Sequence, residues 1–210
     1  MEKLFNNIAE AVLDGQINEV KVLTEEAVEK KATAKEILNK GLLKGMNEVG
    51  ILFKEGELFV PEVLISAKAM DTGMQIIKPL IKEGDIKKSG KCLFATVKGD
   101  LHDIGKKLVS MMLEGAGYEV INLGVDTSPE KIVEAVKEHQ PDILGMSAML
   151  TTTMANMNDT IKALEENGLA DKVKIMVGGA PVSPNYAESI GVNYSSDAHS
   201  AVELANKLMK

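Results

Sequence analysis

The chain has 210 residues, of which 45% are hydrophobic and 26% are charged. This composition is typical of a soluble globular protein with one large domain or two small ones. The formal net charge of −7 argues against a nucleic-acid partner, which would require a basic face. The single cysteine, Cys92, excludes an internal disulfide and fits a reducing compartment. We expect a cytoplasmic protein without a membrane partner, because the sequence has neither a signal-peptide pattern nor an apolar stretch of the roughly 20 residues that span a bilayer.

Residues 1 to 83 show helical periodicity only. Apolar residues three or four positions apart predict four amphipathic helices with short connections, and therefore a small four-helix bundle. The third helix opens with Thr33 and Glu36, which have the spacing of a capping box. The fourth begins at Pro61, a residue suited to the first helical position. The apolar stripes are Leu4, Phe5, Ile8, Val12 and Leu13; Val20, Leu23, Ala27 and Val28; Ile37, Leu38, Leu42, Met46 and Val49; and Val63, Leu64, Ala67, Met70, Met74 and Ile77.

A polar segment with two glycines, residues 82–91, follows the helices. Glycine and charged residues between periodic segments are typical of a linker. We place the domain boundary within this segment. The prediction is a helical-bundle domain at residues 1–88 and a second domain at residues 89–210.

Beyond the linker, short apolar runs alternate with amphipathic helices. Near-continuous apolar strands separated by helices predict a parallel sheet covered on both faces. Five such units favour a flavodoxin-like (Rossmann-like) α/β domain with strand order 2-1-3-4-5, in which strands 1 and 3 flank the point where ligands bind. The expected strands are 92–97, 119–123, 142–147, 173–177 and 192–195, and the expected helices are 105–116, 129–139, 153–167, 184–190 and 198–208.

Three loops at the carboxyl ends of these strands carry polar or small residues. After the first strand, Asp100 and His102 precede Gly105; a carboxylate there can accept from one imidazole nitrogen while the other ligates a metal. After the third strand, residues 147–153 supply four hydroxyl groups and two large apolar side chains. After the fourth, Gly178-Gly179 leaves bare backbone, along which a flat or elongated ligand could lie.

Other interpretations of the first loop fit less well. A phosphate-binding Walker loop would be one residue shorter and would have Ser or Thr where Lys107 stands. A zinc site would need more ligands than this loop offers, and His139 and His199 lie far away in the sequence. A response regulator would cluster acidic residues around a phosphorylatable aspartate, and Asp126 and Asp142 are not obviously so placed. Without its context, an Asp-x-His pair is more often structural than functional.

In this context the loops closely resemble the signature of the corrinoid-binding family. That family includes the cobalamin module of methionine synthase and the small corrinoid proteins of methylamine, methanol and betaine methyltransferase systems. Its signature is D-x-H-x-x-G, then S-x-L, then G-G, and segment 50–61 also resembles the family's cap domain, so the resemblance covers essentially the whole chain. Met149 replaces the leucine, a volume-conserving change, and Thr153 replaces a relay serine but keeps its hydroxyl. The matching residues are Asp100, His102 and Gly105, Ser147 and Met149, and Gly178 and Gly179.

The resemblance implies one cobalamin or other cobamide per chain, with the nucleotide tail withdrawn from cobalt and inserted into the sheet domain. It implies that His102 is the axial cobalt ligand, that Asp100 accepts from its other ring nitrogen, and that Thr153 supports Asp100; these three form the expected catalytic set. Phe53 and Val60 match positions that cover the upper face of the corrin. The expected cofactor-binding residues are Asp100, His102, Asp103, Gly105, Ser147, Met149, Thr151, Gly178, Gly179, Phe53 and Val60.

The resemblance also implies a function as a methyl carrier that does not turn over alone. A substrate-specific methyltransferase would load the cobalt, a methylcorrinoid:pterin or thiol methyltransferase would unload it, and a reductive activase would restore the oxidised cofactor. Because a cap over the methyl group must move, segment 82–91 is expected to act as a hinge. Three alternatives stay open: a corrinoid-binding sensor or regulator, the small subunit of a corrinoid-dependent mutase, and an interaction protein of this fold without a cofactor.

Overall fold

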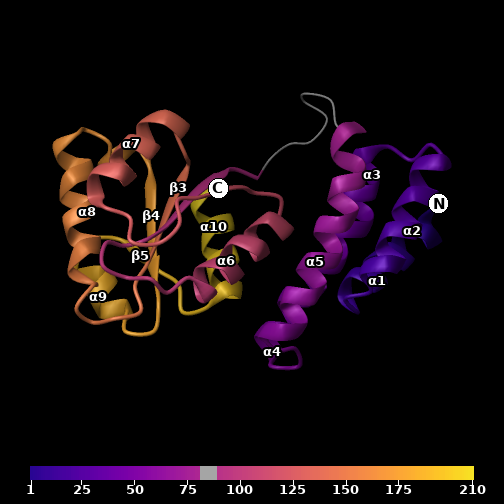
Figure 1. Cartoon of the computed structure of the whole chain (residues 1–210), viewed down its shortest axis with the longest axis horizontal. Coiled ribbons are helices and arrows are strands. Elements are labelled where there is room, and N and C mark those ends of the chain that lie inside the picture. Colours follow the sequence, from indigo (N-terminus) through magenta and orange to yellow (C-terminus); the bar gives the residue numbers. More distant parts are fainter. Residues whose placement is uncertain (81–88) are drawn as a thin grey trace. The chain divides into compact units, whose positions relative to one another are not determined.

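The computed structural model describes residues 1–80 and 89–210 (Figure 1). The chain divides into two compact units, the first containing α1 to α5 and the second containing the sheet and the helices that cover it. Residues 82–88 of the expected linker lie outside the described residues, so the hinge and the domain boundary stay predictions. Within the described part of the chain, no helix is both long and apolar enough to cross a bilayer.

The first unit has the four predicted helical segments. The third contains a π-helical turn, a local insertion of one residue that apolar periodicity over so short a segment does not reveal. Ile8, Val20, Leu42 and Val63, one from each segment, are fully buried and form the centre of the core. The segments are α1 (Glu2–Leu13), α2 (Ile17–Glu29), α3 (Ala34–Ile37) with the π turn (Leu38–Leu42) and α4 (Leu43–Glu55), and α5 (Val60–Ile77), which a 3-10 turn (Lys78–Leu80) follows.

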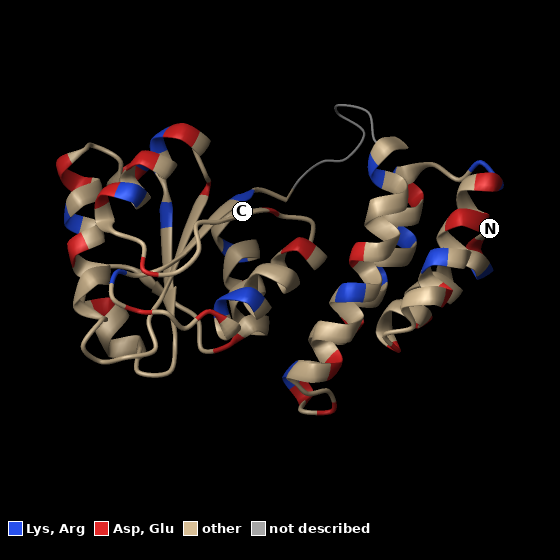
Figure 2. Cartoon of the chain, viewed as in Figure 1, with Lys and Arg blue, Asp and Glu red and all other residues tan. Residues whose placement is uncertain are grey.

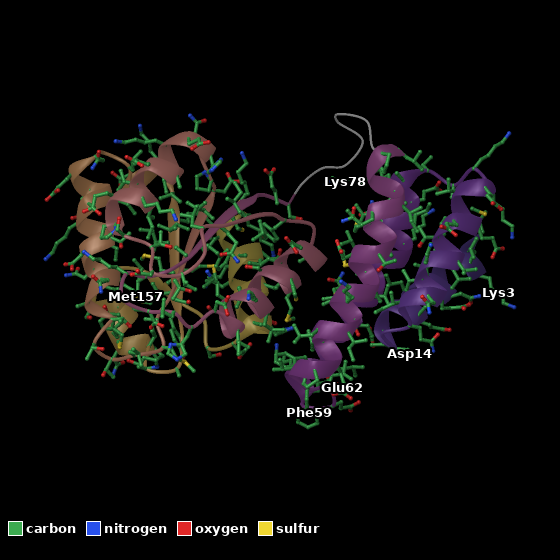
Figure 3. The ribbon with its side chains drawn as sticks, viewed as in Figure 1. Lys3, Asp14, Phe59, Glu62, Lys78 and Met157 are labelled. Carbon is green, nitrogen blue, oxygen red and sulfur yellow. The ribbon has the colours of Figure 1, made fainter. Side chains whose placement is uncertain are left out.

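Side chains cap two of these helices. The Thr33 hydroxyl accepts from the Glu36 backbone N–H (3.2 Å), and the Glu36 carboxylate accepts from the Thr33 N–H (3.2 Å), as the predicted capping box requires. At α5, the Phe59 N–H donates to Glu62 Oε2 (2.7 Å). Figure 3 labels Phe59 and Glu62 at this end of the helix. This bond lets α5 begin at Val60, one residue earlier than predicted.

The second unit is a five-stranded parallel sheet with the predicted order β2-β1-β3-β4-β5. The expected helix from residue 153 begins two residues later, which leaves Thr153 in the preceding turn, and β5 is shorter than predicted. The strands are β1 (Lys91–Thr96), β2 (Glu119–Asn122), β3 (Ile143–Ser147), β4 (Lys174–Gly178) and β5 (Asn193–Tyr194). The helices are α6 (Ile104–Gly115), α7 (Pro129–His139), α8 (Ala155–Glu166), α9 (Pro184–Ser189) and α10 (Ala198–Leu208), with a 3-10 turn at Ala170–Lys172.

The two faces of the sheet pack against different helices. One face packs residues such as Leu93 and Leu144 against α7, α8 and α9, while α6 and α10 lie on the other side (Figure 1). On that second face, the last register row of the three central strands is Thr96, Ser147 and Gly178. Because the strands are parallel, their carboxyl ends meet at one edge. The loops after β1, β3 and β4 therefore begin side by side, next to a row of small residues.

Charged residues occupy exposed helical positions in both units, where acidic and basic side chains are interspersed (Figure 2). Some form pairs one helical turn apart, such as Glu26 with Lys30 and Glu36 with Lys40. Exposed pairs of this kind contribute little to stability individually. Stability therefore rests on the apolar cores of the two units.

Candidate functional site

Asp100 is a fully buried carboxylate in the loop between β1 and α6. Its own backbone N–H donates to the Val97 carbonyl (3.1 Å), which closes a turn directly after the strand. Oδ1 accepts from the His102 backbone N–H (3.0 Å) and lies 2.8 Å from His102 Nδ1. A carboxylate can only accept, so Nδ1 carries the proton. The loop thus fixes both the orientation and the tautomer of the imidazole.

The second oxygen of Asp100 joins this loop to the loop after β3. Oδ2 accepts from the backbone N–H groups of Met149 (2.6 Å) and Leu150 (3.2 Å) and from the Thr153 hydroxyl (2.8 Å). Burial alone would raise the pKa of Asp100, but the hydrogen bonds from Met149, His102 and Thr153 hold it well below its ordinary value. Asp100 is therefore an ionised carboxylate near neutral pH and connects the two loops.

His102 has one nitrogen free to bind a ligand. Its side chain is 55% exposed although its Asp100 partner is buried. The Thr96 hydroxyl donates to the His102 carbonyl (3.0 Å), so the backbone is held as well as the ring. With Nδ1 committed to Asp100, Nε2 carries the lone pair of this exposed ring. A single protein imidazole suits a metal whose other ligands come from a macrocycle, as in haem proteins.

Exposed apolar side chains lie in the same two loops and at the first residue of α6. Leu101 and Ile104 are 71% and 73% exposed, and Met149 and Leu150 are 48% and 43% exposed. Apolar side chains gathered on an exposed surface are typical of a ligand or partner site. Of these four residues, only Met149 was selected from the sequence. The sequence signal for Leu101 and Ile104 is that large apolar residues lie within two positions of a polar loop histidine.

The glycines selected from the sequence differ in what requires them. At Gly179, φ is +126° and a Cβ would lie 1.9 Å from the Ala148 carbonyl oxygen, so the fold itself excludes a side chain. At Gly178, a Cβ would lie 3.0 Å from the Ser195 carbonyl oxygen, a tight contact. At Gly105, nothing lies within 4 Å of a Cβ. Packing within the chain therefore does not explain Gly105, whereas close approach of a ligand to its backbone would.

The remaining predicted residues occupy different environments. Ser147 Oγ lies 3.3 Å from Thr96 Oγ1, at the carboxyl ends of β3 and β1. Asp103 pairs with Lys107 (2.7 Å) and Thr151 is exposed in the loop after β3. In the first unit, Phe53 and Val60 are both half-buried, and neither belongs to the fully buried core.

Two further residues hold the His102 loop and were not selected from the sequence. The Asp126 carboxylate accepts from the Gly99 N–H (2.7 Å), and its own N–H donates to the Asp100 carbonyl (2.9 Å). Lys106 is buried, and its ammonium donates to Asn122 Oδ1 (2.8 Å) and to the Gly124 carbonyl. Burial lowers the pKa of Lys106 to about 8, against the opposing effect of Asp103. The sequence signal for Lys106 is its position in the first turn of the helix that begins directly after the loop.

Two family models match the chain, and both are described as a B12 binding domain. One matches residues 4–78 and the other matches residues 90–204. Both units, including Phe53 and Val60 in the first and the His102 loop in the second, therefore fall within matched segments.

Similar proteins match over the whole chain. Dimethylamine corrinoid protein 3 from Methanosarcina acetivorans is 43% identical over 100% of this chain and 98% of its own length. Among solved structures, the methanol:cobalamin methyltransferase complex MtaBC from Methanosarcina barkeri matches with a TM-score of 0.90 and 30% identity, over 99% of this chain and 80% of that chain. A cobalamin-binding protein from Desulfitobacterium hafniense matches with a TM-score of 0.79 and 32% identity, over 97% and 98% of the two chains. These matches confirm the predicted fold, a helical unit followed by a five-stranded parallel sheet.

Proposed function

We propose that this chain, which belongs to the corrinoid protein family, carries a methyl group on the cobalt of a cobalamin-type cofactor between two methyltransferases. The observation that carries the proposal is the exposed imidazole of His102, whose Nδ1 is held by the buried carboxylate of Asp100. When bound, the corrinoid supplies the cobalt centre that accepts and gives up the methyl group. The residues of the chain hold and orient that centre.

His102 is the proposed axial ligand, through Nε2. Because Asp100 stays ionised, it keeps the proton on Nδ1 and leaves the Nε2 lone pair free. A carboxylate that accepts from the second nitrogen also raises the basicity of the ligating one. Thr153 donates to Asp100 Oδ2 and so acts through Asp100 as a positioning residue. Together these residues set how strongly the imidazole binds cobalt.

The exposed side chains and open backbone near His102 are the proposed contact surface for the rest of the cofactor. The corrin ring would cover Leu101 and Ile104, which are otherwise in water. The nucleotide tail would approach the open backbone of Gly105 and the hydroxyl of Ser147.

Further cofactor contacts extend this proposal. Met149 would cover the corrin together with the apolar side chains of its own loop, and Gly178 would leave room for the nucleotide tail. Roles for Asp103, Thr151 and Gly179 stay predictions. The same holds for Phe53 and Val60 as residues that cover the upper face.

The relatives support the proposed partners. The match to a methanol:cobalamin methyltransferase complex supports a substrate-specific methyltransferase as a partner. The 43% identity with a dimethylamine corrinoid protein favours a methylated amine as the methyl donor. A methylcorrinoid:pterin or thiol methyltransferase and a reductive activase complete the proposed system, which we expect in the cytoplasm.

The test is electron paramagnetic resonance of the full chain reconstituted with cob(II)alamin. Because the free cofactor has a nitrogen ligand of its own, the chain is labelled with ¹⁵N-histidine. An axial histidine then changes the nitrogen splitting from a triplet to a doublet. We expect this isotope effect in the wild type and its loss in His102→Ala.

His139→Ala is the matched control, because His139 is the last residue of α7 and its ring lies 4.0 Å from the carboxylate of the neighbouring Glu138. It removes an imidazole of the same chain from a helix that lies outside the His102 loop. We expect this variant to keep the isotope effect. Failure of the wild type to bind the cofactor, or an isotope effect that persists in His102→Ala, would contradict the proposal.

A further inference from the structure

The segment at the carboxyl end of β2, residues 122–127, is bonded to both flanks of the His102 loop. On the amino-terminal flank, the Gly99 N–H donates to Asp126 Oδ1 (2.7 Å), and the Asp126 N–H donates to the Asp100 carbonyl (2.9 Å). Also on this flank, the Thr96 N–H donates to the Gly124 carbonyl (3.1 Å). These bonds tie the segment to the end of β1 and the beginning of the loop.

Lys106 supplies the bonds on the carboxyl-terminal flank. It lies in the first turn of α6, four residues after His102, and is 3% exposed. Its ammonium donates to Asn122 Oδ1 (2.8 Å) and to the Gly124 carbonyl. The Asn122 side chain is itself fixed, because Oδ1 also accepts from the Gly124 N–H (3.0 Å). The Gly124 carbonyl thus receives one donor from each flank of the loop.

Burial of an ammonium group is unfavourable unless its donors are satisfied. Hydrogen bonds from a charged donor are about twice as strong as those between neutral groups. An ordinary helix start would need no such group, and the adjacent Lys107 is 56% exposed. The buried charge therefore lies where the chain leaves the histidine loop and enters α6, and it restrains that junction.

We propose that Lys106 is a positioning residue for His102. Lys106 ties the start of α6 to Asn122 and Gly124. This restraint limits the backbone freedom of the His102 loop, which lies between β1 and α6, so that the imidazole stays where it can reach the axial position. This inference rests on the proposed function. It assigns Lys106 no contact with the cofactor.

The test uses the full chain labelled with ¹⁵N-histidine and loaded with cob(II)alamin. The quantity measured is the ratio of histidine-ligated to unligated Co(II) in the resonance spectrum. We expect Lys106→Met to lower this ratio about tenfold, since a hydrogen-bonded charge is lost. Lys106→Arg, which keeps a donor and a positive charge, should restore part of it. Lys107→Met removes the same charge from the next position and should match the wild type.

A further variant and a further measurement keep the inference testable if Lys106→Met does not fold or does not bind the cofactor. Asn122→Ala removes one acceptor and leaves Lys106 in place, so it should lower the ratio in the same direction even where Lys106→Met does not fold. In the chain without cofactor, amide hydrogen exchange at Gly99 and Asp126 should quicken in Lys106→Met and not in Lys107→Met.

The inference is overturned if Lys106→Met and Asn122→Ala keep the wild-type ratio, or if Lys107→Met lowers it equally. Absence of any histidine ligation in the wild type would instead overturn the proposed function. In that case the exchange rates would still report whether Lys106 restrains the loop.

Discussion

The loop after β1 (residues 97–103) and the loop after β4 (residues 179–183) lie at the same edge of the sheet and are held in opposite ways. The first is fixed by side-chain hydrogen bonds, with five donors converging on Asp100. The second is fixed by close backbone packing, with Gly179 against the Ala148 carbonyl. A ligand that needs both an oriented imidazole and bare backbone requires one loop held by side-chain hydrogen bonds and another held by backbone packing. Each loop should therefore fail for a different reason when it is changed.

The largest expected effect is in the second loop. In Gly179→Ala, the new Cβ would lie 1.9 Å from a backbone oxygen at a φ of +126°. Strain and overpacking together should lower the free energy of unfolding by about 4 kcal/mol. Urea denaturation of the chain without cofactor measures this. Gly178→Ala is the control, since its Cβ would lie 3.0 Å from the Ser195 oxygen; equal effects of the two variants would contradict the backbone-packing explanation.

The next effect is in the first loop. Asp100→Ala removes the buried acceptor of the Met149 N–H and of both His102 donors. We expect the free energy of unfolding to fall by about 3 kcal/mol. Asp103→Ala removes a half-buried carboxylate of the same loop, which pairs with Lys107 and not with Asp100 or His102, and should leave the urea midpoint nearly unchanged. A similar fall in both variants would mean that charge in the loop, rather than the bonds to Asp100, is what matters.

Only part of this difference between the two loops could be predicted from the sequence. The strand order followed from alternating strands and helices, and the proximity of Asp100 and His102 follows from their separation by one residue. The distinction between Gly179 and Gly105 could not be predicted, because it depends on the path of Ala148, a residue distant in sequence. The burial of Lys106 was likewise hidden, since its partners are the last residue of β2 and a residue just after that strand. The features that the sequence did not predict are those that depend on how closely the backbones of two elements distant in sequence approach each other.

The Thr153 hydroxyl tests how much a single donor contributes to the first loop. It lies 2.8 Å from Asp100 Oδ2 and 2.9 Å from the Leu150 carbonyl. Thr153→Val keeps the shape and removes the hydroxyl, and should cost about 1 kcal/mol in unfolding free energy. Thr153→Ser keeps the hydroxyl and should cost less. If Thr153→Val is as stable as the wild type in urea denaturation while Thr153→Ser is less stable, methyl packing and not the bond to Asp100 explains the residue.

A further effect, visible as a pH dependence, concerns Lys106. Burial lowers its pKa from 10.5 to about 8 in the folded chain. Between these values the unfolded chain binds more protons, so stability rises with pH. The contribution is fully present above pH 10.5 and is lost as the pH falls through 8. The difference in unfolding free energy between the wild type and Lys106→Met should therefore change in favour of the wild type from pH 8 to pH 10. A flat difference would mean that Lys106 titrates as an exposed lysine does.

The smallest expected effect is an increase in stability, and it compares the same glycine-to-alanine change at Gly105 and at Gly179. Gly105 lies in the first turn of α6 with open space around it, so Gly105→Ala should stabilise the chain without cofactor by about 0.5 kcal/mol. The same substitution at Gly179 should be strongly destabilising. A glycine that costs stability and is not required by packing is explained by a ligand that approaches its backbone. Gly105→Leu should therefore fold normally and yet retain less cobamide after gel filtration, measured by visible absorbance; full retention would leave Gly105 without a role at the site.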